Sequence, residues 1–118
     1  MSSRFFRDRI IAYKKGGTYL AVSLEFDLLT EGCSIKEALE RLHDATFGYL
    51  QTCYQENETD NEIYRKAPKK YQDLYELFIE LSEKKRMKEE EKIKEKRLLE
   101  QEIQTTQRTY SSRSFCYA

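Results

Sequence analysis

The segment 19–50 constrains the fold of this chain more than any other. It opens with an alternating run in which Leu20, Val22 and Leu24 face one way and the residues between them face the other. A glycine follows at position 32, and after it apolar residues recur at helical spacing. This order predicts a strand, a turn and a helix, which form the central unit of a small α+β domain with an antiparallel sheet.

A second strand is expected just before this segment. Residues 9–13 form a short β-prone run, and residues 14–18 contain two adjacent glycines that can adopt the positive φ angles of a tight hairpin turn. Strands at 9–13 and 19–24 should therefore pair antiparallel. Residues 26–30 are expected to add a third strand after a bend at 25–27.

The helix after the glycine carries a start signal. Ser34 and Glu37 have the spacing of a capping box, in which the serine hydroxyl and the glutamate each satisfy a free backbone N–H. The apolar positions of the predicted stripe are Ile35, Ala38, Leu39, Leu42, Ala45, Tyr49, Leu50 and Cys53. A helix over 35–53 would cover one face of the sheet, and residues 1–56 would form the α+β domain.

Residues 57–82 are expected to form an amphipathic helical segment. After Pro68, which is tolerated in the first turn of a helix, apolar residues recur at spacings of three and four. The face that they define can be buried against the domain itself or against another subunit. We predict an oligomer or partner interface at Tyr71, Leu74, Tyr75 and Phe78.

The last part of the chain is strongly polar. Residues 83–104 are dominated by Glu, Lys and Arg, which predicts a charged, solvated helix, because the few apolar residues lack the heptad spacing of a coiled coil. Residues 105–118 are rich in Ser and Thr, which favours a disordered tail.

Charge and cysteine content limit the function classes. The chain has 21 basic and 21 acidic residues, and the charge stays nearly balanced in both halves, so nucleic-acid binding is disfavoured and promoter DNA is a doubtful partner. The three cysteines show no metal-binding or disulfide spacing. With no apolar run long enough for a signal peptide or a membrane span, a cytoplasmic protein is expected.

No enzyme motif stands out. Carboxylates near the predicted sheet occur at Asp8, Glu25, Asp27, Glu31 and Glu37. Gathered at strand ends they could hold Mg²⁺ for a nuclease based on Asp27, but solvated acidic residues are routine at such places. The single histidine, His43, borders the helical stripe. We therefore predict no catalytic residue, no metal and no cofactor.

The stretch 20–45 resembles the HicB-like antitoxin family. Its members run from a hairpin strand through an acidic segment and a glycine into a helix that opens with Ser/Thr-x-x-Glu-Ala. The residues here that match this pattern are Glu25, Asp27, Gly32, Ser34, Glu37 and Ala38. The similarity covers roughly residues 7–55.

The resemblance implies a partial ribonuclease-H-like β-β-β-α fold without nuclease activity. It also implies an oligomeric antitoxin that binds a small mRNA-cleaving HicA-like toxin and occludes its functional surface. An orphan dimerisation or scaffold module without a toxin is the alternative, and a divalent-metal nuclease is a third.

Overall fold

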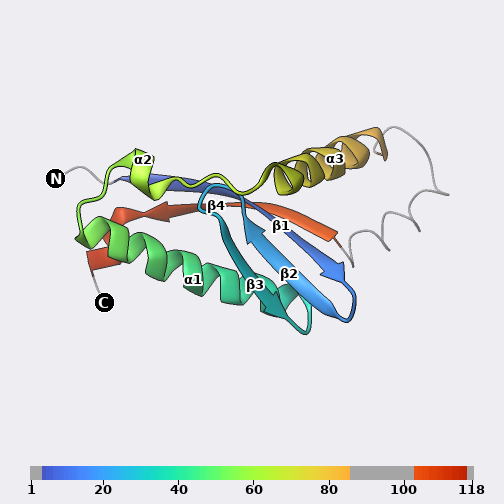
Figure 1. Cartoon of the computed structure of the whole chain (residues 1–118), viewed down its shortest axis with the longest axis horizontal. Coiled ribbons are helices and arrows are strands. Elements are labelled where there is room, and N and C mark those ends of the chain that lie inside the picture. The colour runs from blue at the N-terminus through green and yellow to red at the C-terminus, as the bar shows by residue number, and fades with distance from the viewer. Residues whose placement is uncertain (1–3, 86–102, 117–118) are drawn as a thin grey trace.

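The computed structural model describes residues 4–85 and 103–116, with side chains for 4–80 and 103–115, and shows an α+β fold with a four-stranded antiparallel sheet (Figure 1). The elements in chain order are β1 Phe5–Lys15, β2 Thr18–Ser23, β3 Leu28–Gly32, α1 Ile35–Gln55, α2 Asp60–Ile63, α3 Lys69–Lys85, β4 Ile103–Ser111 and the 3-10 helix η1 Ser112–Cys116. The strand order is β3-β2-β1-β4.

The β1–β2 hairpin forms as the sequence predicts. Lys15 pairs with Thr18, so the loop is the two residues Gly16 and Gly17. Gly16 has a φ of +63°, in the left-handed region that glycine adopts without a steric penalty. The predicted bend between β2 and β3 is also present, with Asp27 at a φ of +53°.

Alternation along the strands buries both faces of the sheet. On one face, β1 and β2 pack against α1 through the cluster Ile10, Ala12, Ala21, Ala38, Leu39 and Leu42. On the other face they pack against α3 and the segment before it through Ile11, Val22, Leu24, Ala67 and Tyr75. A third cluster joins the far end of α1 to Phe6, Phe26, Ile63, Tyr110 and Phe115. The sheet is thus the middle layer of three.

The start of α1 follows the prediction with one difference. The Ser34 hydroxyl accepts the Glu37 N–H at 3.1 Å, but the Glu37 carboxylate accepts the N–H of Cys33, at 3.3 Å, and not that of Ser34. The predicted stripe also shifts by one position in the middle of the helix, because Thr46 is fully buried and Ala45 is exposed. The orientation of the helix on the sheet decides this, and a polar residue takes a core position.

The expected disordered tail is wrong for the part of it that the structure describes. Residues 103–111 form β4, which pairs along nearly the whole of β1, from Ile103 opposite Tyr13 to Ser111 opposite Phe5. The polar composition led to a wrong prediction for two reasons. The backbone of this Thr-rich strand is satisfied by hydrogen bonds to β1, and only Tyr110 and Phe115 provide large buried side chains in the described part of the segment.

The middle of the chain divides into two helices. The predicted helical segment 57–82 contains the four-residue α2, an extended stretch at 64–68 and then α3. Of the predicted charged helix 83–104, residues 83–85 belong to α3 and 103–104 to β4, and the rest lies outside the described residues. None of the described helices has the length and apolar character needed to cross a membrane.

Candidate functional site

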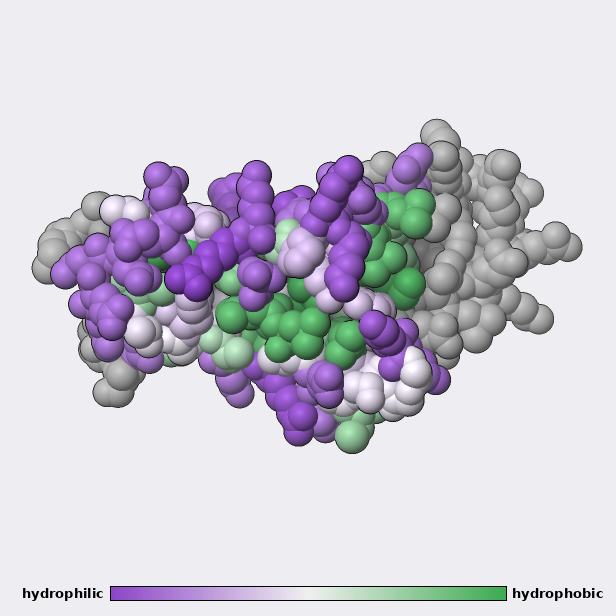
Figure 2. All heavy atoms as spheres, viewed as in Figure 1, coloured by the Kyte–Doolittle hydropathy of each residue, from purple (hydrophilic) through white to green (hydrophobic). Residues whose placement is uncertain are grey.

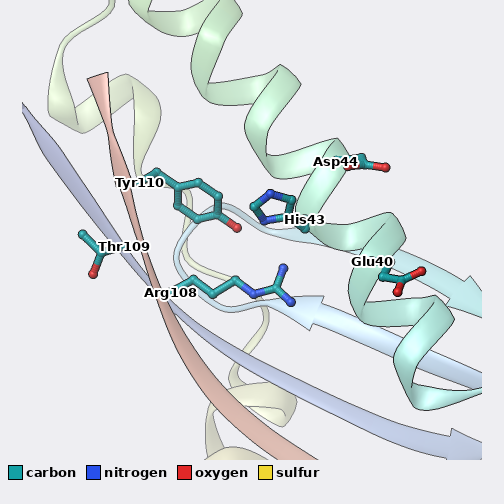
Figure 3. A pocket seen from close by; sticks show the side chains of 6 residues that line it. All are labelled: Glu40, His43, Asp44, Arg108, Thr109 and Tyr110. Carbon is teal, nitrogen blue, oxygen red and sulfur yellow. The ribbon is translucent and has the colours of Figure 1, made fainter. Parts of the chain in front are cut away.

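A polar groove lies between the flank of α1 and β4. It has a volume of about 650 Å³. Its lining residues are Glu40, His43, Asp44, Arg108, Thr109 and Tyr110. Figure 3 shows that His43, Arg108 and Tyr110 face one another across the groove, whereas the carboxylates of Glu40 and Asp44 point away from it.

The two elements hold these side chains in place by regular geometry. On β4, Arg108 and Tyr110 are two residues apart and therefore share the face of the sheet that α1 covers. The half-buried Arg108 donates from Nη1 to the carbonyl of Leu39 at 3.3 Å. The ring of His43 stacks on that of Tyr110, with centroids 5.7 Å apart. The groove walls are thus tied together by a hydrogen bond and a ring contact.

A buried carboxyl group lies under this groove. Asp8 is the cross-strand partner of Arg108 and is only 1% exposed. Its Oδ1 accepts hydrogen bonds from the hydroxyl of Ser23 at 2.9 Å and from the N–H of Glu25 at 3.3 Å, while its Oδ2 accepts none from the part of the chain that the structure describes. Burial raises the pKa of Asp8 to about 6, and the bond from Ser23 opposes this rise.

Two further buried hydroxyl groups lie near Asp8. The Thr46 and Tyr110 hydroxyls make no hydrogen bond of ordinary geometry with the described residues, although Tyr110 interacts with both Thr46 and Arg108. Burial raises the pKa of Tyr110, and the nearby Arg108 partly offsets the rise. Buried polar groups without partners cost stability, so the α1 face carries a polar site inside its core.

The groove presents charged and polar side chains that can bind a partner. Its lining residues do not include the carboxylates near the predicted sheet that could hold Mg²⁺. Arg108, Glu40 and Asp44 form no ion pair with another described residue, so their charges are available to a partner. Within residues 4–85 and 103–116 no three metal-ligating side chains come together. His43 lies at the edge of the helical stripe, as predicted, and lines the groove.

The predicted interface residues of α3 mostly face their own sheet. Tyr75 is buried against β1 and β2, and Tyr71 and Leu74 are partly buried in the same cluster. These contacts assign the apolar face of α3 to the core of this chain, and the assignment of Tyr75 to a partner surface is corrected for that reason. Phe78 is half-buried, and its role in an interface stays a prediction.

The six motif positions separate into two groups. Gly32, Ser34, Glu37 and Ala38 meet at the joint between β3 and α1, where a Cβ on Gly32 would lie 2.6 Å from the backbone nitrogen of Ala38. Glycine is therefore required for this close approach.

The two acidic motif positions lie elsewhere. Glu25 pairs with Arg9 at 2.8 Å, and Asp27 is exposed in the bend before β3. Glu25 and Asp27 thus have different surroundings, and the metal-nuclease alternative stays a prediction that metal titration can test.

Sequence reasoning missed Arg108 and Tyr110, because it treated their segment as a tail. The available signal was the set of β-branched residues Thr105, Thr106 and Thr109, since such residues favour a strand. It was weak because the segment has few apolar residues. No family model, curated protein or solved structure matches this chain.

Proposed function

We propose that this chain is a non-catalytic HicB-like antitoxin-type protein that acts in the cytoplasm by binding and occluding a small HicA-like mRNA-cleaving toxin. The observation that carries the proposal is the joint between β3 and α1. Four of the motif residues, Gly32, Ser34, Glu37 and Ala38, contribute to it together, and the glycine allows the strand to approach the first turn of the helix.

The surface of the α3 side supports a binding role. Figure 2 shows apolar residues gathered over the sheet and beside α3 on this side of the molecule. Leu29 on β3 is 48% exposed and Leu77 on α3 is 53% exposed, and both are large apolar side chains. Apolar residues within a polar rim are the usual basis of a protein interface.

The direct test is binding to a HicA-like protein encoded next to this gene. The two chains are co-expressed, purified through a tag on the toxin, and assayed for toxin activity in cell-free translation. Copurification with restored translation supports the proposal. Absence of such a neighbouring gene, or copurification without restored translation, contradicts it and favours the orphan scaffold module.

Substitutions on α3 test whether this helix contributes to the toxin-binding surface. The double variant Leu77→Glu with Phe78→Glu is expected to weaken toxin binding at least tenfold, because loss of two apolar contacts at an interface costs roughly 1.4 kcal/mol or more. Asp73→Lys on the same helix is the matched control, since Asp73 is exposed and its substitution also changes the charge of the helix. Equal binding by the double variant and the control would place the toxin elsewhere.

A further inference from the structure

The two edges of the sheet differ in how well their backbone groups are protected. β3 is five residues long, and its outer carbonyl at Glu31 accepts Nη1 of Arg41 at 3.0 Å. β4 is nine residues long and contains no proline, lysine or bulge that would discourage pairing. Among the described residues no strand pairs with its outer side.

The hydrogen-bond register shows which groups of β4 point outward. The Ser112 N–H donates to the carbonyl of Arg4 at 2.8 Å, and the register pairs Phe6 with Tyr110 and Asp8 with Arg108. Because hydrogen-bonded pairs alternate along an antiparallel ladder, the even-numbered residues of β4 bond to β1. The N–H and C=O groups of the odd-numbered residues therefore lie on the free edge: Thr105, Gln107, Thr109 and Ser111.

We propose that this free edge pairs with the same edge of a second copy of the chain, in an antiparallel β4–β4 ladder centred on Gln107. Position 107 is the midpoint of β4, so this register pairs the whole strand with its symmetry mate. Thr105 then lies opposite Thr109 of the second copy, and all outward groups in this part of the strand find partners. The result is one continuous sheet across a two-fold axis.

Charge favours this register over its neighbour. With the axis at Gln107, Arg108 lies directly opposite the uncharged Thr106 of the second copy, and the two Arg108 side chains are only diagonal neighbours. A shift that centred the ladder on Arg108 would bring two guanidinium groups directly opposite each other, which is unfavourable.

The polar groove is continuous with this interface. A two-fold axis perpendicular to the sheet places both α1 helices on the same side, so the two grooves join over the paired strands. Arg108 of each copy then lies on the floor of a shared trough, and Glu40 and Asp44, which form no ion pair with a described residue, lie along its walls with their carboxylates turned outward.

The proposal concerns self-association and does not rest on toxin binding, since it is measured with the full chain alone. Sedimentation equilibrium should show the 14.2 kDa chain passing to twice that mass with rising concentration. A strictly monomeric protein would overturn the proposal, and toxin binding could still hold.

A charge-swap experiment tests the register. Gln107→Lys and Gln107→Glu each place like charges opposite each other at the axis, so each is expected to weaken self-association roughly five- to tenfold. An equimolar mixture of the two variants pairs opposite charges and should restore the dimer. Weakening without restoration, or no weakening, would contradict a ladder centred on Gln107.

A proline substitution, which removes one outward backbone N–H, tests whether the edge of β4 forms the interface. Thr109→Pro removes an N–H that points outward, and two-fold symmetry removes it twice, so the dimer should be lost while the circular dichroism spectrum of the monomer stays unchanged. Glu31→Pro makes the matched change on the outer side of β3 and should leave the dimer intact. A dimer that survives Thr109→Pro, or one that Glu31→Pro dissociates, would exclude the β4 edge.

Discussion

On the α1 face of the sheet, Asp8 is buried and forms no ion pair with a described residue, whereas on the α3 face Glu25 is paired with Arg9 at 2.8 Å. Arg9 also donates to Gln72 on α3 at 2.8 Å and lies over the ring of Tyr75. The two faces are built on alternate residues of the same strands, yet one keeps a carboxyl group away from water and the other keeps one paired near the surface.

The two faces should therefore differ in how strongly their stability depends on substitution and on pH. Burial of Asp8 costs free energy whenever its carboxyl group is ionised, because the protein interior solvates the charge less well than water does. The Arg9–Glu25 pair remains partly exposed and is worth only a modest amount. The α1 face should therefore respond strongly to substitution and to pH, and the α3 face weakly to both.

The largest contrast should come from leucine truncation on the two faces. Leu42→Ala removes a fully buried side chain under α1 and should lower the free energy of unfolding by about 3 kcal/mol. Leu74→Ala on α3 removes a half-buried one and should cost about 1 kcal/mol. Urea denaturation measures both, and equal losses would show that the two faces are packed alike.

Asp8→Asn should produce the next largest effect, and one that depends on pH. The folded-state pKa of Asp8, about 6, lies above its unfolded value near 3.8, so the native state binds more protons between these values. Stability from this group is complete below pH 4 and is lost as pH rises through 6. Relative to the wild type, the variant should therefore gain about 2 to 3 kcal/mol between pH 4 and pH 8.

The measurement is denaturant unfolding of both proteins across that pH range. Because all other groups are shared, their titrations cancel in the difference. A difference that stays flat with pH would mean that Asp8 is not desolvated as its surroundings indicate.

Breaking the ion pair on the α3 face should cost less. Arg9→Leu leaves Glu25 without its cation and should lower stability by about 1 to 2 kcal/mol at pH 7, with a smaller loss at high salt. Arg7→Leu is the control, since Arg7 is exposed on the same face of β1. Thermal unfolding compares them, and a loss as large as that of Leu42→Ala would argue against a weak pair.

The smallest expected effects come from two Thr→Val substitutions, which should change the stability in opposite directions. Thr46→Val removes a buried hydroxyl that makes no hydrogen bond of ordinary geometry with the described residues and nearly keeps the side-chain volume, so stability should rise by about 0.5 to 1 kcal/mol. Thr30→Val removes a hydrogen bond of 2.8 Å to the carbonyl of Ala38 and should lower stability by about 1 kcal/mol. Calorimetry of both variants decides, and a loss at Thr46 would show that its hydroxyl does find a partner.

Local patterns predicted a large part of this fold. Strict alternation identified β2, the glycine pair identified the hairpin, and Ser34 identified the start of α1, because each of these signals acts through a few neighbouring residues. β4 escaped because its strand conformation depends on a partner more than ninety residues away in sequence, as the pairing of Asp8 with Arg108 shows.

The site was the least predictable part for the same reason. Asp8 was one of five carboxylates near the predicted sheet, and its sequence neighbours do not reveal that it is buried. His43 was placed correctly on the helix, but its contact with Tyr110 joins two elements far apart in the chain.

Local conformational preference and hydrophobic periodicity are enough to predict the antiparallel hairpin, the capped helix and the apolar faces that make an α+β domain. The completion of the sheet by the polar C-terminal segment becomes visible only in the folded chain. That pairing buries Asp8 beside Arg108 and leaves the outer edge of β4 without a partner strand among the described residues, because burial and cross-strand contact depend on which distant residues meet.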